Sequence, residues 1–410
     1  MIKINLKVLK QYSLLFLALL YSGHAIAASS NAWYGVSKYY VGIVLFVIWL
    51  IRRHGKVLVG HNNGASFGIL VAWAIIMFLN CIFHSATETF YGYFAIFTTP
   101  LIAFVIVTSI DQNIFGRMYV RVMFIISIIS LAFFYFFQFT PIFELFPTLL
   151  GLDQFGDVNE KYKGLFFYYR LDPSRNNGPF WEPGIYASFL IFAFLFAHKF
   201  VEERRKRLVY YLVFTLTILS TGSSAGYVLL ILAMICIVSY KISQNKDSTQ
   251  RCIYSIVCII LTVVACIAYL NLETLIDTLG LSGNMTVTKL LDVTENARVT
   301  SMSWSWQKFL ERPLFGHGIV GLSLQGGGAE TSTTTSLRLM AALGIAGVLF
   351  TVIMVIGVFR QKRISFLTKS IFLLIWLMIV NKESQDAFVL HWVLVFYFNS
   401  TDDMLCRKST

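Results

Sequence analysis

Residues 337–359 read LRLMAALGIAGVLFTVIMVIGVF, and Arg338 is the one charged residue among them. An apolar helix of about 20 residues is long enough to cross the hydrocarbon core of a bilayer. The sequence therefore predicts an all-α polytopic membrane protein with about 12 transmembrane helices. The predicted helices are residues 12–28, 34–51, 66–84, 90–110, 118–139, 183–200, 207–220, 224–241, 252–270, 337–359, 365–381 and 387–400.

The composition agrees with a membrane protein. Of the 410 residues, 57% are apolar and 13% are charged, whereas soluble domains run about 45–50% apolar and about 25% charged. This excludes a soluble enzyme and a disordered chain, and the lack of alternating strand patterns argues against an outer-membrane barrel. We expect a single membrane domain over residues 1–410. None of the six cysteines lies in a long loop or in a CxxC pair, so no metal site is predicted.

The basic residues set the predicted orientation. The net charge is +12, and the Lys and Arg residues gather in short clusters between apolar runs, as on the cytoplasmic side of membrane proteins. With the N-terminus inside, 22 of the 33 basic and 6 of the 21 acidic residues lie inside. This arrangement predicts a multi-pass membrane protein, with the lipid bilayer and not nucleic acid as its partner. Residues 1–27 are either a cleaved signal or the first helix.

Two long loops, residues 140–182 and 271–336, fall on the extracytoplasmic side in this orientation. Function often lies on long loops held by a rigid scaffold. We therefore expect the chemistry on the extracytoplasmic face. ATP is absent from that compartment, which argues against an ATP-driven enzyme.

The first loop ends in RLDPSRNNGPFWEPGIYA, residues 170–187. Arg175 and Glu182 come just before a helix that is predicted to begin at Pro183, a favoured first helical residue. Arginine suits phosphate because its planar fork donates two hydrogen bonds at once. These residues predict an anion site with an acid beside it. The alternative is a capping carboxylate with surface arginines. The other binding candidates of this loop are Arg170 and Trp181.

The second loop contains NARVTSMSWSWQKFLERPLFGHG, residues 296–318. The apolar spacing from Arg298 to Leu310 predicts an amphipathic helix on the membrane surface. Its tryptophans either join an interfacial aromatic belt or stack on sugar rings. His317, between two glycines, is either a catalytic or a structural histidine. The other candidates are Trp304 and Arg312 in this loop and Arg338 at the start of the next helix, where the arginine could instead snorkel.

A polar segment, STGSSAG at residues 220–226, interrupts the apolar stretch between Lys206 and Lys241. This stretch is too short for two full perpendicular spans. A polar break at membrane depth is tolerated where it is buried in protein or lines a wet cavity. The alternative is a tight hairpin at the outer surface.

Taken together, these motifs resemble the O-antigen polymerase and O-antigen ligase superfamily of bacterial membrane enzymes. The resemblance rests on Arg175-x-x-Gly178 followed by Glu182-Pro183, on the STGSSAG break, on Arg298…Trp304…RPLFGHG, and on Gly344-Ile-Ala-Gly347. It covers most of the chain and implies a GT-C-like glycosyltransferase architecture.

The sequence also departs from the family pattern. The break usually carries an arginine after serine, where this chain has Ser224 or Ala225. Ligases typically have a His-Asn pair ahead of the Gly-x-x-Gly segment and a Glu two residues before its first glycine. Here Thr333 and Thr334 occupy the pair, and Ala342 occupies the Glu position. The absence of the ligase histidine favours a polymerase, or a diverged relative, over a ligase.

The resemblance implies transfer of a glycan from undecaprenyl diphosphate to the next carrier-linked repeat unit, without a metal or cofactor. Glu182 is then the first candidate base and His317 the second. The arginines expected to hold the diphosphate are Arg175, Arg298 and Arg338. A ligase acting on lipid A-core is the alternative of the same class, and a flippase or permease is the alternative of another class. A chain-length regulator and a flippase are candidate partners.

The orientation is testable with reporter fusions placed after Lys161 and after Asn284. Because positive charge is retained inside, we expect both fusions to be active with a periplasmic reporter and inactive with a cytoplasmic one. Cytoplasmic activity at either position would overturn the topology.

Overall fold

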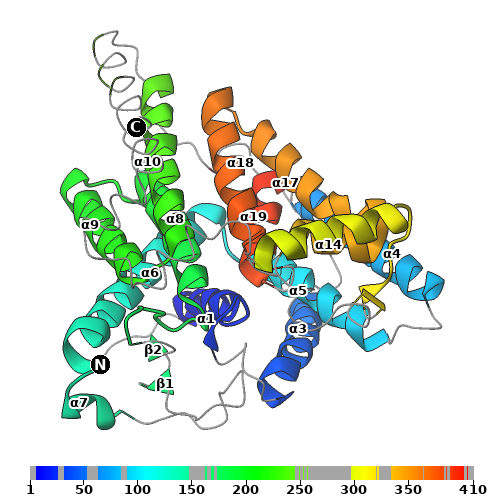
Figure 1. The fold of residues 1–410 in the computed structure, drawn as a ribbon, viewed down its shortest axis with the longest axis horizontal. Coiled ribbons are helices and arrows are strands. Elements are labelled where there is room, and N and C mark those ends of the chain that lie inside the picture. The colour runs from blue at the N-terminus through cyan, green and yellow to red at the C-terminus, as the bar shows by residue number, and fades with distance from the viewer. Residues whose placement is uncertain are drawn as a thin grey trace. The chain divides into compact units, whose positions relative to one another are not determined.

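The fold is that of a computed structural model (Figure 1). It describes residues 6–25, 32–52, 63–84, 90–146, 162–163, 168–169, 173–244, 249, 253, 256, 297–319, 321–322, 334–362, 364–382, 385, 388–400 and 404. Within these ranges, helices occupy eleven of the twelve predicted segments. The remaining one, 252–270, lies outside the described residues except at positions 253 and 256.

The chain divides into two compact units. Unit 1 comprises Met1–Phe115, Ala297–Gln361 and Leu377–Met404, and unit 2 comprises Gly116–Asn296, Lys362–Trp376 and Leu405–Thr410. The predicted first loop therefore belongs to unit 2, and the described part of the second loop belongs to unit 1.

Unit 1 is built around α5, which packs against α1, α3, α4 and α19. Large aromatic side chains fill this core: Trp392 contacts Trp73 and Phe350, each at 4.9 Å between ring centroids. Such pairs add to the stabilisation by buried area. The helices of this unit are α1 (Leu6–Leu20), α3 (Ala32–Arg52), α4 (Asn63–Phe83), α5 (Phe90–Ser109), α14 (Ala297–Glu311), α16 (Thr335–Leu343), the 3-10 helix η3 (Gly344–Val348), α17 (Leu349–Arg360) and α19 (Val389–Ser400).

Unit 2 is built around α8, whose residues from Pro183 to Ala197 are all buried. It packs against α9 and α10, and the three lie side by side in green in Figure 1. The elements of this unit are α6 (Gln112–Ala132), which begins in unit 1 and continues into the π-helix η1 (Phe133–Phe137), then α7 (Pro141–Glu144), β1 (Tyr162–Lys163), β2 (Tyr168–Tyr169), α8 (Pro183–Phe200), α9 (Arg204–Ser220), α10 (Ser224–Gln244) and the first part of α18 (Phe366–Val380).

Helix dominates the described residues. The only strands there are β1 and β2, a two-residue antiparallel pair within the first loop. Apart from this short pair, the described residues confirm the predicted all-α class.

Five of the described helical segments are long and apolar enough to cross a membrane: Gly64–Phe83, Gln112–Phe137, Pro183–Phe200, Ser224–Gln244 and Thr335–Arg360. On the first of these, Ile75, Phe78 and Ile82 are more than half exposed. An exposed apolar stripe of this kind is a liability in water and is expected in contact with lipid. The chain is thus a helical polytopic membrane protein, and the full number of about 12 spans remains a prediction.

The predicted helix 337–359 is interrupted, because α16 ends at Leu343 and α17 begins at Leu349. The second loop docks at this interruption. The backbone N–H groups of His317 and Gly318 donate to the carbonyl oxygens of Ala341 and Ala342, each at 2.9 Å, and Ile345 N–H donates to Pro313 O at 2.7 Å. The loop therefore supplies hydrogen-bond partners at the place where the regular helix stops.

Gly344 makes this docking possible. Its φ is 65° and its ψ is −146°, a backbone region that is essentially restricted to glycine. A Cβ atom here would lie 2.4 Å from the carbonyl oxygen of Leu314. The loop and the helix junction can therefore approach this closely only with glycine at position 344.

We expect Gly344→Ala to destabilise the folded protein by about 1–3 kcal/mol, the usual cost of overpacking, because backbone would have to move. Gly64→Ala is the matched control, since a Cβ at Gly64 meets nothing within 4 Å. The measurement is thermal unfolding of both purified variants in detergent. Equal melting temperatures would contradict the docking geometry.

Candidate active site

The polar break between α9 and α10 is buried. α9 ends at Ser220 and α10 begins at Ser224, and Thr221 between them has no exposed surface. The two hydroxyl groups bond locally: Ser220 donates to Thr217 O and Thr221 donates to Ile218 O, each at 2.7 Å. The break is therefore a buried polar turn within unit 2, and the end of the first loop lies against it.

Asn176 joins the first loop to this break. The side chain is fully buried, and its backbone N–H donates to Ser220 O at 2.9 Å. Its Nδ2 donates to Ser220 Oγ at 3.0 Å and to Ser130 Oγ at 3.3 Å, while its Oδ1 accepts from Gly178 N–H at 2.9 Å. One amide thus connects the loop, the break and α6.

Arg175 is the predicted residue that lies at the break. Its Nε donates to the carbonyl oxygen of Thr221 at 3.3 Å, and its side chain is half-buried. The bond fixes the guanidinium through Nε, whereas phosphate recognition by arginine uses the parallel N–H groups of the fork. The contact therefore orients a cation beside the buried turn.

Glu182 occupies the N-cap position of α8, with Pro183 as the first helical residue, as predicted. Its backbone is extended and its carbonyl accepts from Tyr186 N–H at 3.2 Å, but the carboxylate makes no capping hydrogen bond. Its Oε2 atom is buried. The capping alternative is therefore wrong for this side chain. The carboxylate lies near the positive end of the α8 dipole, which favours negative charge.

Gly178 closes the turn between Arg175 and Glu182. Its φ is 52°, and a Cβ atom would lie 2.6 Å from the ring of Tyr186. The Tyr186 hydroxyl group is 2.8 Å from Ser130 Oγ, so ring and turn are held against α6. Trp181 is half-buried beside this turn, and Arg170 lies outside the described residues.

Three buried polar residues of this site were not among the sequence-based candidates: Asn176, Ser130 and Tyr186. Asn176 carried a detectable signal, since the Asn-Asn-Gly sequence is typical of a turn with side-chain-to-backbone hydrogen bonds. Ser130 and Tyr186 lie within apolar runs and carried none.

The remaining candidates lie in unit 1. Arg298 is in the first turn of α14, which packs against α16, the helix that carries Arg338. Arg312 is exposed just after α14. In the same unit, Trp304 is half-buried. Arg298, Trp304 and Arg338 thus lie on two neighbouring helices, and Arg312 directly follows one of them.

The described part of α14 is amphipathic, as predicted. Ser301 and Ser305 form a buried face, and Met302, Trp306 and Leu310 form an exposed apolar stripe. The Trp306 ring lies 5.4 Å from that of Phe309. An outward apolar stripe suits contact with lipid, which favours the interfacial alternative for Trp306.

His317 is buried in the turn that follows α14. Its Nε2 lies 3.0 Å from the carbonyl oxygen of Lys308 and 3.5 Å from Glu311 Oε2. Because a carbonyl oxygen only accepts, Nε2 carries the proton in this arrangement. Burial lowers the pKa of His317 below its ordinary value. The histidine holds the end of α14 in place, so its geometry favours the structural alternative over the catalytic one.

This environment predicts a pH-dependent stability. Folding lowers the pKa of His317, so neutral His317 contributes to the free energy of unfolding above its unfolded pKa of about 6.5. This contribution is lost as the pH falls through the lower pKa of the folded protein. Glu311 stays ionised across this range, since the hydrogen bond from Lys308 lowers its pKa. We expect the melting temperature to fall between pH 7.5 and 5.5, and to fall less in His317→Gln. An identical fall in both proteins would contradict this assignment.

The described residues contain no group of three or more His, Cys, Asp or Glu side chains that could hold a metal ion. No protein-family model, no curated protein and no solved structure matches the chain.

Proposed function

We propose that the chain is a polymerase of O-antigen or a related surface polysaccharide in a bacterial inner membrane. The donor is the growing glycan on undecaprenyl diphosphate, and the acceptor is a sugar hydroxyl group of the next carrier-linked repeat unit. The proposal is supported by the motif resemblance and by the helical polytopic fold. The reaction takes place on the periplasmic face.

One observation carries the proposal: Arg175 donates to the buried polar break, and Glu182 lies seven residues later in the same loop, at the start of a buried helix. An oriented guanidinium suits a diphosphate leaving group, and a carboxylate suits an acceptor hydroxyl group. A glycosyl transfer from a lipid diphosphate uses both kinds of group.

The reaction follows from these groups. The acceptor oxygen attacks the anomeric carbon of the donor, and the bond between that carbon and the diphosphate oxygen breaks. Glu182 takes the hydroxyl proton, and Arg175 stabilises the charge that develops on the departing undecaprenyl diphosphate. Arginine can supply this stabilisation without a metal. Arg298 and Arg338 remain sequence-based candidates for phosphate contact.

Two alternatives give different cellular products. A ligase would transfer the finished glycan to lipid A-core, and a flippase or permease would move it without chemistry. Deletion of the gene, followed by lipopolysaccharide gels, separates them. A single-repeat product indicates a lost polymerase, whereas retained carrier-linked polymer with bare core indicates a lost ligase. If the protein is a flippase or permease, the purified protein will have no transferase activity.

Substitutions in the turn test the assigned roles. We expect Arg175→Ala and Glu182→Gln each to reduce polymer formation by about 10²–10³-fold, as when one preorganised charged group is removed. Arg175→Lys should restore only part of the activity, because a point charge cannot replace the fork. The measurement is chain growth on a carrier-linked repeat unit by purified protein.

Glu144→Gln is the matched control, because Glu144 is an exposed carboxylate of the same loop and unit. It should retain normal activity. His317→Gln should retain more activity than Glu182→Gln. Wild-type activity of Glu182→Gln together with an inactive His317→Gln would reverse the two roles.

A further inference from the structure

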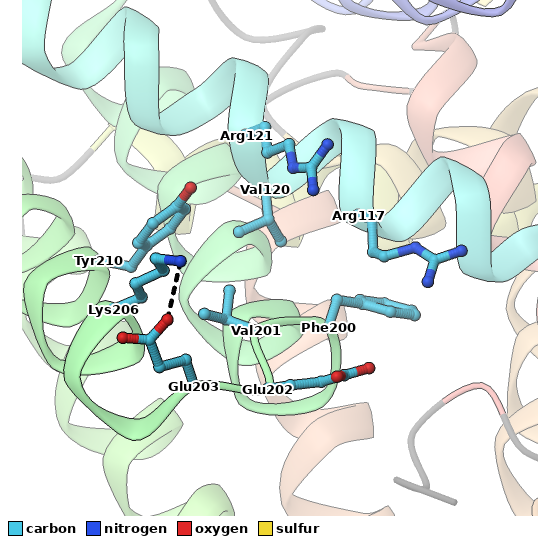
Figure 2. Close-up of a pocket in the computed structure, with 9 residues that line it drawn as sticks. All are labelled: Arg117, Val120, Arg121, Phe200, Val201, Glu202, Glu203, Lys206 and Tyr210. Atoms are coloured by element: carbon cyan, nitrogen blue, oxygen red, sulfur yellow. Dashed lines mark ion pairs between the residues drawn. The ribbon is translucent and has the colours of Figure 1, made fainter.

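Unit 2 contains a polar cavity whose lining includes no residue of the first loop. Its volume is about 390 Å³, and it lies where α6 faces the connection between α8 and α9 (Figure 2). The predicted orientation puts its charged residues on the cytoplasmic side, opposite to the proposed chemistry. The lining residues are Arg117, Val120, Arg121, Phe200, Val201, Glu202, Glu203, Lys206 and Tyr210.

Two arginines form one wall of this cavity. Arg117 and Arg121 are four residues apart on α6, so they project from the same face of the helix (Figure 2). Both side chains are exposed. The nine lining residues form one ion pair among themselves, between Lys206 Nζ and Glu203 Oε2 at 2.7 Å. This pair lies on the wall opposite to the arginines. The guanidinium groups are therefore available to an anion that enters the cavity.

The opposite wall has a fixed backbone. Arg207 donates from Nη1 to the carbonyl oxygen of Val201 at 3.0 Å, which ties α9 to the end of α8. The carboxylates of Glu202 and Glu203 lie on this wall. They repel anions of high charge more than an anion of single charge.

The cavity also has an apolar part. Val120 is 1% exposed, and Phe200 and Val201 line the space beside it. The ring of Tyr210 stacks on Phe124 with 4.0 Å between centroids, which fixes its position. A charged wall next to an apolar surface matches a ligand that joins a phosphate to hydrocarbon.

We propose that this cavity binds the phosphodiester headgroup of a membrane phospholipid, with Arg117 and Arg121 on the phosphate oxygens. A phosphodiester carries one negative charge and suits a wall of two arginines that faces carboxylates. Basic pockets between helices on the cytoplasmic side are known sites for lipid headgroups. This site is separate from the proposed polymerase chemistry and would stand if that function were wrong. A free phosphate ion shares the chemistry and is tested alongside.

The test is thermal unfolding of the delipidated protein in detergent. The probes are phosphatidylglycerol, phosphatidylethanolamine, diacylglycerol with the same acyl chains, and sodium phosphate. We expect both phospholipids to raise the melting temperature, because a ligand that binds only the folded state stabilises it. Diacylglycerol and sodium phosphate should have little effect. Native mass spectrometry of the wild type gives the lipid stoichiometry independently.

Paired variants assign any effect to the cavity. Arg117→Gln/Arg121→Gln should weaken phospholipid binding by at least about tenfold. The matched control is Arg204→Gln/Arg205→Gln, which removes the same charge from exposed arginines nearby that do not line the cavity. This control should bind like the wild type. If the glutamine pair does not fold, Arg117→Lys/Arg121→Lys keeps the charge and should bind with an intermediate affinity.

Two results would overturn the proposal: equal protection by diacylglycerol, or wild-type binding by the Arg117→Gln/Arg121→Gln protein. If sodium phosphate but neither phospholipid raises the melting temperature, and if the Arg117→Gln/Arg121→Gln protein loses this effect, the cavity binds a free anion and not a lipid headgroup.

Discussion

A backbone N–H or C=O group that is removed from water needs a hydrogen-bond partner, since leaving it without one costs several kcal/mol in an apolar environment. An apolar helix that ends away from water therefore needs hydrogen-bond partners from another segment. The chain supplies such partners in each unit. In unit 2, Asn176 and Arg175 bond to the carbonyl oxygens of Ser220 and Thr221. In unit 1, the turn at Pro313 to Gly318 bonds around Gly344.

This constraint explains why the polar motifs occur together. The end of the first loop lies at the α9–α10 break because the break requires its donors, and the second loop lies at the α16–α17 junction for the same reason. Polar side chains that could do chemistry are thereby fixed at interruptions of apolar helices. In unit 2 the result is a half-buried arginine and a half-buried carboxylate in the loop segment ahead of α8. In unit 1 the histidine is used to hold the turn itself.

The helices were largely predictable from the sequence because each depends on a continuous apolar run. The positions of Arg175 and Glu182 ahead of α8 were predictable from Pro183 and the local turn residues. The contacts between segments that are distant in the sequence were not predictable. Asn176 and Ser220 are 44 residues apart, and Asn80, which donates to Phe315 O at 2.8 Å, is 235 residues from it. No local pattern encodes such pairings. The interruption at Gly344 was missed because its neighbours are apolar on both sides.

The enclosure of α8 affects how the protein reaches its membrane. Of the five described segments that could span, Pro183–Phe200 is the least apolar, and 89% of it is covered by other parts of the chain. A segment that faces protein gains little from contact with lipid. The position of α8 in the membrane therefore depends mainly on packing against neighbours such as α9 and α10. The helix that begins after Glu182 is thus held by protein contacts more than by the bilayer.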